Sequence, residues 1–292
     1  MSIRHAQQVK DWNGQSGEAW VTHQAGLDRM LRPFGEAAID AARPAAGERV
    51  LDVGCGAGET SRALADRVGS EGRVTGIDIS APLIARAREG SGGDGRIGFL
   101  LDDAGRADLP SGGFDLLYSR FGVMFFDDPV AVFAHLRKAL KPAGRLAFVC
   151  WRAAGENDWI RLPMDAIRDI VPAQPPLPPD APGPFSFGDR KRVENILSKA
   201  GFADIAFRSF DHDIIFGRGA TRDSAAEEAL HMAFEVGPLS RALTDQGDAV
   251  RARAAQAVRA AFARRAGERA EGISTVTIDG AAWIVTARNR PG

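Results

Sequence analysis

The sequence has few cysteines, little net charge and no long apolar run, and each shortage excludes a class of protein. Its 292 residues include two cysteines, Cys55 and Cys150, which are too few for a disulfide framework and lack the spacing of metal ligands. A formal net charge of −1 gives no overall positive field for nucleic acid. No stretch approaches the ~20 apolar residues of a membrane helix, and the first residues lack the apolar core of a signal peptide. We therefore expect reduced thiols, a cytoplasmic location, no bound metal, no nucleic acid and no membrane span.

Patterns typical of nucleophilic or metal-dependent catalysis are also missing. The sequence shows no Ser-His-Asp, Cys-His or metal-binding cluster. Adjacent carboxylates at 102–103 and 127–128 would point to opposite faces of an extended strand, so neither pair is typical of a catalytic dyad. The chain is nevertheless long enough, and with 45% hydrophobic residues apolar enough, to bury a substantial core. One main domain with insertions is the resulting expectation.

The most informative segment that is present covers residues 50–60, where an apolar run leads into alternating glycines. Residues 50–53 suit a buried parallel strand. Gly54, Gly56 and Gly58 lack the β-carbons that would hold a ligand away from the backbone. The segment therefore predicts a ligand site between a strand and a helix.

The position of an acidic residue before these glycines separates two classes of cofactor. A dinucleotide site has the pattern G-x-G-x-x-G, with a pyrophosphate at the helix N-terminus. Here the pattern is D-x-G-x-G-x-G from Asp52, and the helix is expected over 57–68. A carboxylate at this position favours a ligand with a positive charge, such as the ammonium of an amino acid. S-adenosylmethionine is such a ligand; the structural alternative is an ordinary glycine-rich turn.

Acidic residues also follow the next expected strands, over 74–79 and 97–101. Asp78 comes about 20 residues after the glycines, the offset at which a carboxylate meets ribose hydroxyls. The later strand is followed by Asp102, Asp103 and Ala104, where a carboxylate and backbone groups could meet an adenine edge. A fourth strand, over 114–119, leads into an arginine and several phenylalanines. Ligands of open α/β sheets collect at this edge, so the residues are expected to converge.

Local signals mark the helices and the turn between these strands. Ser80 is expected to cap the helix after the second strand. Asp128 as N-cap, with Pro129 at the first helical position, is expected to begin the helix after the fourth strand. Residues 141–144, Lys-Pro-Ala-Gly, are expected to form a turn into the fifth strand.

These segments together resemble the class I S-adenosylmethionine-dependent methyltransferases, in the branch that includes quinone and polyketide small-molecule methyltransferases. The resemblance spans about residues 45–151 and departs from the family in its doubled aspartate, where one aspartate usually precedes the alanine. It implies a Rossmann-like α/β fold with a seven-stranded, mostly parallel sheet, an antiparallel last strand and helices on both faces. The segments that carry it are Val-Leu-Asp-Val-Gly-Cys-Gly-Ala-Gly, Gly-Ile-Asp, Leu-Asp-Asp-Ala, Ser-Arg-Phe-Gly-Val-Met-Phe-Phe-Asp-Asp-Pro and Leu-Lys-Pro-Ala-Gly-Arg-Leu-Ala-Phe-Val-Cys-Trp.

The resemblance implies S-adenosylmethionine as methyl donor and S-adenosylhomocysteine as product. The glycine loop would hold the methionine part, Asp78 the ribose, and Asp103 with Ala104 the adenine. Phe121 and Trp20 rank first among the aromatic residues that would border the site, although an apolar stripe at helical spacing is more often core. The expected donor-binding set is Asp52, Gly54, Cys55, Gly56, Gly58, Asp78, Ile79, Asp103, Ala104, Phe121 and Trp20.

Segments outside this core are expected to be mainly helical. The related enzymes fold an N-terminal segment over the cofactor, and two insertions are expected to form a substrate cap; the alternative is that they cover a sheet face or a dimer interface. A proline-rich stretch over 172–184 cannot be regular helix. The expected organisation is an N-terminal helical segment over 1–45, a core over 46–154, 186–216 and 280–292, and insertions over 155–185 and 217–279. Within these segments we expect helices over 158–171 and 189–200, strands over 205–216 and 281–287, and three helices between 221 and 267.

The chemistry of a sulfonium methyl limits what the protein must add. The methyl group is already activated, so alignment with a nucleophile and exclusion of water are the main tasks, and a general base is optional. Of the five histidines, His23 and His231 are the better candidates for a base because their segments are expected to face the pocket; a surface or packed role is the alternative for each. Arg120 is a candidate for holding an anionic substrate oxygen, with a structural ion pair as the alternative.

The sequence therefore predicts an enzyme that transfers a methyl group from S-adenosylmethionine to an oxygen or carbon nucleophile of a hydrophobic or aromatic small molecule, by in-line displacement. The acceptor is its expected partner, and a homodimer is left open. One alternative is a protein that binds S-adenosylmethionine and catalyses a non-methylating step such as a cyclisation. An NAD-dependent oxidoreductase and a purely regulatory binding module are the others.

Overall fold

The computed structural model describes residues 2–172, 178, 181–235, 237–269 and 272–290. Of the proline-rich stretch expected over 172–184, residues 173–177 and 179–180 lie outside the described residues. The chain divides into two compact units. The first contains Met1–Arg152, Asp180–Phe210 and Ala282–Gly292, and the second contains Ala153–Pro179 and Asp211–Ala281.

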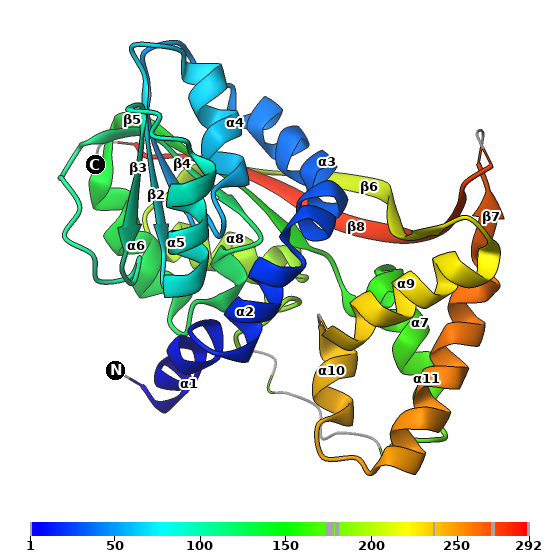
Figure 1. The fold of residues 1–292 in the computed structure, drawn as a ribbon. Helices are drawn as coiled ribbons and strands as arrows, with labels where there is room; N and C mark the ends of the chain where they lie inside the picture. Colours follow the sequence, from blue (N-terminus) through cyan, green and yellow to red (C-terminus); the bar gives the residue numbers. More distant parts are fainter. Residues whose placement is uncertain (1, 173–177, 179–180, 236, 270–271, 291–292) are drawn as a thin grey trace. The chain divides into compact units, whose positions relative to one another are not determined.

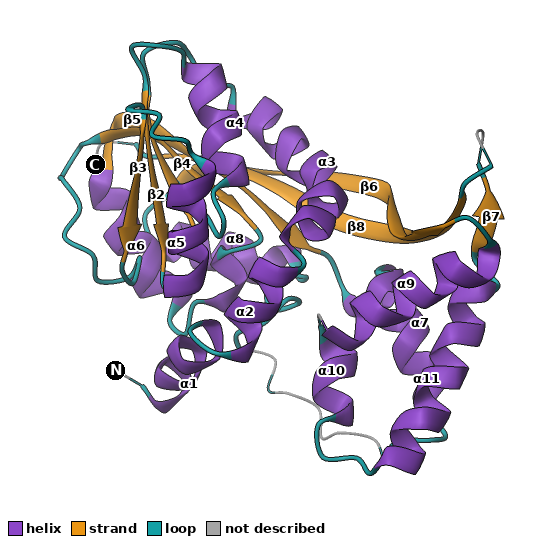
Figure 2. Cartoon of the chain, viewed as in Figure 1, coloured by secondary structure: helices purple, strands orange, loops and turns teal. Residues whose placement is uncertain are grey.

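A mostly parallel sheet forms the centre of the first unit (Figures 1 and 2). Its strand order is β3-β2-β1-β4-β5-β8-β6, and the short β7 pairs with β8 off this path. The pairs from β3 to β5 are parallel, whereas β8 runs antiparallel to β5. This arrangement confirms the predicted fold class. The strands are β1 (Arg49–Val53), β2 (Arg73–Asp78), β3 (Ile97–Leu101), β4 (Phe114–Arg120), β5 (Leu140–Trp151), β6 (Ala203–Gly219), β7 (Ala266–Glu268) and β8 (Ser274–Arg288).

Helices cover both faces of this sheet, with α3, α4 and α5 on one face and α6 and α8 on the other (Figure 1). The N-terminal segment is helical, as predicted, and consists of α1, α2 and α3. The helices of the first unit are α1 (Ile3–Trp12), α2 (Gln15–Thr22), α3 (Gln24–Ala42), α4 (Glu59–Val68), α5 (Ala81–Gly90), α6 (Pro129–Ala139) and α8 (Arg190–Lys199), with the 3-10 turn η1 (Val123–Phe125).

The sequence explains why these elements form and where they pack. The side chains of β1 after Arg49 are buried, as an apolar run covered on both faces requires. At α6, Asp128 accepts a hydrogen bond from Ala131 N at 3.0 Å, and Pro129 occupies the first turn, as expected of an N-cap followed by proline. Tyr118 of β4 is fully buried and donates its hydroxyl to Gly35 O of α3 at 2.9 Å. The core therefore lies between the sheet and these helices.

Some element boundaries differ from the predicted ones. Residues 141–144 were expected to form a turn before the fifth strand, but β5 begins at Leu140. Asn289 supplies the reason, because its carbonyl accepts from Ala143 N at 2.9 Å and its N–H donates to Gly144 O at 2.8 Å. The last strand also begins earlier, at Ser274 rather than 281, and α4 begins at Glu59 rather than 57.

The second unit packs helices against the outer parts of β6 and β8. Alanines of α9, together with Val258 and Phe262 of α11, form its buried interior. Asp158, at the first turn of α7, is buried with ion pairs to Arg161 and to Arg265, the latter at 2.6 Å. The three helices expected between 221 and 267 are confirmed. The helix expected over 158–171 is α7, and it ends at Ile167. The helices are α7 (Asp158–Ile167), α9 (Arg222–Glu235), α10 (Pro238–Leu243) and α11 (Asp248–Ala263), with the 3-10 turn η2 (Ala154–Glu156).

Across the described part of the chain, none of the helices combines the length and the apolar character needed to cross a bilayer.

Candidate functional site

The glycine loop follows β1 at the carboxyl edge of the sheet. The N–H groups of Gly54 and Cys55 both donate to Ile77 O of β2, at 2.8 and 3.2 Å. Gly54, Gly56 and Gly58 have positive φ angles of 68°, 53° and 78°, which side-chain-bearing residues rarely adopt. The loop is therefore held tightly against the neighbouring strand in a backbone path that requires glycine.

The glycines of this loop serve two different purposes. A β-carbon on Gly54 would lie 2.9 Å from the Cα of Gly122, so this glycine allows two backbone segments to approach each other. A β-carbon on Gly56 would meet no heavy atom within 4 Å. Gly56 therefore presents bare backbone to open space, which is the position where a ligand can come close to the chain.

Asp52 lies beneath this loop and is completely buried. Its Oδ2 accepts hydrogen bonds from Thr60 and Ser61 of α4, each at 2.7 Å. Its Oδ1 is buried with no hydrogen-bond partner among the described residues. Burial raises the pKa of Asp52 to about 6, although the two hydroxyl groups act in the opposite direction. A buried carboxylate with hydrogen bonds to only one of its two oxygens fits a ligand that brings positive charge.

Asp78 closes the other side of the loop from the end of β2. Its Oδ2 accepts from Gly56 N at 2.8 Å and its Oδ1 accepts from Ser80 N at 2.9 Å. Burial raises the pKa of Asp78, and hydrogen bonds from the Ser80 and Gly56 N–H groups partly offset it. The structure thus brings Asp52, Asp78 and the glycine loop together, as the sequence predicts.

Asp103 stands at the end of β3 and contacts the N-terminal segment. Its Oδ1 accepts from Gly105 N at 2.8 Å, while its Oδ2 lies 3.1 Å from Nε2 of His5 on α1. Asp102, by contrast, is exposed. Of the doubled aspartates, Asp103 is therefore the one that joins the other elements at this edge.

A set of polar contacts between α1, α2 and α5 escaped the sequence reasoning. Asn13 donates to Ile79 O at 3.0 Å and accepts from Ala81 N at 2.9 Å, so it caps α5 from a distant part of the chain. Ser80 occupies the N-cap position, but its hydroxyl donates to Trp12 O at 2.6 Å rather than capping the helix as predicted. The only sequence signal was the Asn-Gly dipeptide at 13–14, which is typical of a turn.

Arg120 lies at the end of β4, where its guanidinium is paired with two carboxylates. Nη1 donates to Glu59 of α4, and Nη2 donates to Asp28 of α3 at 3.2 Å. Burial alone would lower the pKa of Arg120, but Glu59 and Asp28 outweigh it and raise that pKa. Gly35 leaves room for this side chain, since a β-carbon there would lie 2.9 Å from the Arg120 Cδ. The geometry thus favours the ion-pair alternative for Arg120.

The aromatic residues divide into two groups. Phe121 has a positive φ of 59° and is buried, stacking on Trp151 with ring centroids 4.1 Å apart. Trp20 is half-buried and meets Trp12 edge to face at 5.7 Å, and Trp12 in turn contacts Phe125 at 5.5 Å. Phe121 therefore contributes packing behind the strand end, whereas Trp20 belongs to the N-terminal helices.

The remaining predicted residues have these surroundings. The buried Cys55 thiol points under the loop, because a β-carbon on Gly76 would lie 2.8 Å from its Sγ. Ile79 and Ala104 are half-buried next to Asp78 and Asp103. His23 joins α2 to α3 in the first unit, and His231 is exposed on α9 of the second unit.

Comparison with known proteins identifies relatives of this chain. The family model described as methyltransferase domain matches residues 50–144. Aklanonic acid methyltransferase DauC of Streptomyces sp. (strain C5) is 38% identical over 147 residues, which cover 48% of this chain and 67% of that protein. Nocamycin O-methyltransferase of Saccharothrix syringae is 31% identical over 186 residues, which cover 60% of this chain and 66% of that protein.

A solved structure extends the likeness to the fold as a whole. The YcgJ protein from Bacillus subtilis superposes with a TM-score of 0.57 at 16% identity, covering 89% of this chain and all of that one. This likeness concerns the fold alone, whereas the two sequence relatives are each matched over about two thirds of their length. With the glycine loop and its acidic partners inside the matched region, the chain belongs to the class I S-adenosylmethionine-dependent methyltransferases.

Proposed function

We propose that this enzyme methylates an oxygen or carbon nucleophile of a hydrophobic or aromatic small molecule, by in-line displacement at the methyl carbon. The observation that carries the proposal is the similarity to the enzymes named for aklanonic acid and for nocamycin O-methylation. Its physical support is the glycine loop, where Gly56 faces open space, and the buried Asp52 beneath the loop, whose Oδ1 has no hydrogen-bond partner among the described residues.

The donor-binding roles rest on the geometry of the carboxyl edge. We assign the methionine part to the backbone of Gly54, Cys55, Gly56 and Gly58, with Asp52 below it as the balancing negative charge. Asp78 and the adjoining Ile79 would bind the ribose, because the Asp78 carboxylate meets the loop at Gly56 N. Asp103 and Ala104 would border the adenine, and Trp20 would close the site from α2.

The protein's remaining tasks are alignment and proton removal. S-adenosylmethionine supplies an electrophilic methyl group, which is lost from the sulfonium as the new bond to the acceptor forms. An acceptor hydroxyl must then release its proton, and His23 and His231 are the proposed bases. Arg120 positions α3 and α4 against β4 through Asp28 and Glu59.

The second unit supports a hydrophobic acceptor. Helix α7 is amphipathic, and several of its large apolar side chains are only half-buried, as are Met232 and Phe234 of α9. Half-exposed apolar side chains of this size suit recognition of an apolar molecule. We assign acceptor selection to the insertions over 155–185 and 217–279. The half-buried apolar residues of α7 are Trp159, Ile160, Leu162 and Met164.

Mass spectrometry of reaction products tests the proposed function. Purified enzyme is incubated with aklanonic acid or related aromatic polyketides, first with ordinary S-adenosylmethionine and then with the trideuteromethyl donor. We expect a product heavier by one methyl group, and correspondingly heavier with the labelled donor. Consumption of the acceptor without added methyl mass would instead indicate the non-methylating alternative.

Matched variants then assign the base. His23→Gln and His231→Gln each remove one candidate, and His135→Gln is the control because its ring is already engaged with the backbone, with Nε2 3.0 Å from Ala107 O. A base variant should lower kcat for a hydroxyl acceptor and flatten its pH profile while leaving donor affinity unchanged. Equal turnover in all three variants would remove both assignments.

A further inference from the structure

The corner between α1 and α2 is hydrogen-bonded to the segment that follows β2. Ser80 Oγ donates to Trp12 O at 2.6 Å, and Asn13 Oδ1 accepts from Ala81 N at 2.9 Å. Asn13 Nδ2 also donates to Ile79 O at 3.0 Å. Two adjacent residues of the N-terminal segment therefore bond to three consecutive residues after the strand.

These contacts replace the usual cap of α5. Ser80 occupies the N-cap position, where a serine oxygen normally accepts from an N–H group of the first turn. Its side chain makes no such bond here, because the hydroxyl donates to the Trp12 carbonyl. Asn13 supplies the acceptor to that turn instead, at Ala81 N. A local cap is thus exchanged for a contact between segments that lie 68 residues apart in the sequence.

Tight packing surrounds this exchange. Ser80 is fully buried, and Gly17 of α2 is buried as well. A β-carbon on Gly17 would lie 2.2 Å from Trp12 O, 2.9 Å from Ser80 Oγ and 3.0 Å from Pro82 Cγ. Gly17 therefore allows α2 to approach the start of α5, and the corner and residues 79–81 pack as one piece.

The same segment holds Asp78. Ser80 N donates to Asp78 Oδ1 at 2.9 Å, and Gly56 N donates to Asp78 Oδ2 at 2.8 Å. Ser80 is thus bonded to Asp78 through its N–H and to Trp12 through its hydroxyl. A continuous series of hydrogen bonds therefore runs from the α1–α2 corner to the carboxylate and on to the glycine loop.

We propose that Asn13 and Ser80 are positioning residues for the ribose of the donor. They hold residues 79–81 so that the Asp78 carboxylate is aimed at the ribose hydroxyls, and the inference rests on the proposed role of Asp78 in donor binding. Neither residue has to touch the donor. Their effect on affinity passes through hydrogen bonds from the hydroxyls to the carboxylate, which are charge-assisted and depend on direction.

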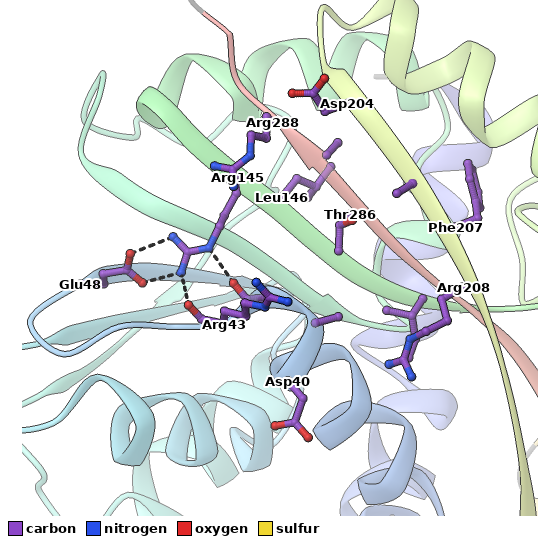
Figure 3. Close-up of a pocket in the computed structure, with 15 residues that line it drawn as sticks. Asp40, Arg43, Glu48, Arg145, Leu146, Asp204, Phe207, Arg208, Thr286 and Arg288 are labelled. Carbon is purple, nitrogen blue, oxygen red and sulfur yellow. Dashed lines mark hydrogen bonds and ion pairs between the residues drawn. The ribbon is translucent and has the colours of Figure 1, made fainter.

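The amino edge of the same sheet carries a comparable lock far from the donor loop (Figure 3). A groove there is lined by the end of α3 and by parts of β5, β6 and β8. Leu116 of β4 pairs with Val50 of β1 on one side and with Arg145 of β5 on the other, so Arg145 is level with the start of β1. The exposed arginines that line this groove are Arg43, Arg208 and Arg288.

Arg145 ties α3 to β5 at this edge. Its guanidinium donates to both carboxylate oxygens of Glu48, at 2.8 and 2.6 Å, and to the carbonyls of Ala42 and Arg43, at 2.6 and 2.7 Å (Figure 3). These carbonyls end α3, so Arg145 also caps that helix. Burial opposes ionisation of Glu48, but the hydrogen bonds from Arg145 outweigh it and lower the pKa of Glu48. Arg145 therefore joins distant segments without reaching the donor loop.

Calorimetry with two ligands tests the proposal. The first is S-adenosylhomocysteine, and the second is its 2′,3′-dideoxy analogue, which lacks the ribose hydroxyls. The wild type should bind the analogue at least about tenfold more weakly. In Asn13→Ala, affinity for S-adenosylhomocysteine should fall about fivefold, whereas affinity for the analogue should change less than about twofold. A merely structural role would weaken both ligands equally and leave the preference between them unchanged.

Asn13→Ala is the primary variant, because Asn13 is exposed and its truncation leaves the buried core intact. Ser80→Ala, which keeps the N–H bond to Asp78, should also reduce the preference for the ribose ligand. Asn13→Asp retains the acceptor for Ala81 N and should restore part of that preference. Circular dichroism shows that each variant is folded.

Two further variants are controls. Gln7→Ala removes another exposed amide of α1, whose bond to Asp11 Oδ1 at 2.7 Å stays within the helix. Arg145→Met loosens the fold at the opposite edge of the sheet. Both should keep the wild-type preference between the two ligands.

The outcomes separate this inference from the proposed function. A wild-type preference that persists in Asn13→Ala and Ser80→Ala would overturn the positioning role and leave the role of Asp78 standing. Equal affinity of the wild type for the two ligands would instead remove the ribose role of Asp78, and the positioning role with it.

Discussion

The two edges of the central sheet carry charges of opposite sign, and they hold them in different ways. At the carboxyl edge, Asp52 is buried and Asp78 is half-buried beside bare backbone, and Oδ1 of Asp52 has no hydrogen-bond partner among the described residues. At the amino edge, Glu48 and Arg145 neutralise each other, and the unpaired charges are exposed arginines. One sheet thus presents a desolvated negative site for a cationic donor at one edge and exposed arginines at the other. The comparison shows that burial and pairing decide which charges a local site presents. The net charge of −1 does not reveal either edge.

The largest effect on stability is expected for Gly54→Ala, at the carboxyl edge. The substitution puts a β-carbon on a residue with φ of 68°, 2.9 Å from the Gly122 Cα, and should cost about 2–4 kcal/mol of unfolding free energy. Gly56→Ala meets no atom within 4 Å and should cost only about 1 kcal/mol, yet weaken S-adenosylhomocysteine binding at least about tenfold. Urea unfolding and calorimetry measure both quantities.

Gly112→Ala is the control for these glycine variants, because Gly112 has a φ of 61° and open surroundings away from the loop. It should share the small stability loss of Gly56→Ala without its effect on binding. If Gly56→Ala bound S-adenosylhomocysteine as well as Gly112→Ala does, the assignment of Gly56 to the ligand surface would be wrong.

Asp52→Asn should separate stability from binding. The folded pKa of Asp52 is raised from 3.8 to about 6, so protonation favours the fold and this stability is present at low pH and lost as the pH rises through about 6. The variant should therefore be more stable than the wild type at pH 8, by up to roughly 2–3 kcal/mol, with the advantage fading between pH 6 and pH 4. It should also bind S-adenosylmethionine more weakly, because the balancing charge is gone. Thermal unfolding across this pH range measures the first effect, and a pH-independent difference would contradict it.

Arg145→Met tests whether the amino edge is held by one ion pair. It removes the cap of α3 and leaves Glu48 without its partner, and should cost about 2 kcal/mol. Glu48 has a lowered pKa, so the stability that depends on its charge is present above the ordinary glutamate pKa and is lost as the pH falls. The deficit of the variant should therefore shrink in acid, as urea unfolding at neutral and low pH would show. A deficit that grew in acid would refute this account of the Glu48–Arg145 pair.

The smallest effect is expected for His5→Gln. The contact of His5 with Asp103 joins two partly exposed side chains, and such pairs contribute less than about 1 kcal/mol. Donor affinity should change by no more than about threefold, measured by calorimetry with Asp103→Asn and the exposed Asp102→Asn as comparisons. A large loss in His5→Gln would show that α1 contributes more to donor binding than this contact explains.

The sequence was sufficient for the parts of the fold that local pattern controls. The apolar run before Gly54, the alternating glycines and the acidic strand ends led to the correct strands and to one convergent edge. Asp128 with Pro129 likewise predicted the start of α6, because a cap acts within one helical turn.

Contacts between distant residues could not be predicted in the same way. Asn13 caps α5 across 68 residues, and Asn289 turns residues 141–144 into a strand by pairing with them. The two carboxylates at Arg120 come from α3 and α4, and nothing in their spacing identifies them as a pair. The pairing of Arg145 with Arg288 likewise depends on strand register between β5 and β8, which periodicity alone does not fix.

Calorimetric titration with S-adenosylhomocysteine tests the central claim most directly, in the wild type, Asp78→Ala and the Arg208→Gln, Arg288→Gln double variant. We predict one-to-one binding in the wild type, a loss of at least about tenfold in Asp78→Ala, and unchanged affinity in the double variant. Unchanged affinity in Asp78→Ala, or a comparable loss in the double variant, would contradict the assignment of the donor to the acidic edge of the sheet.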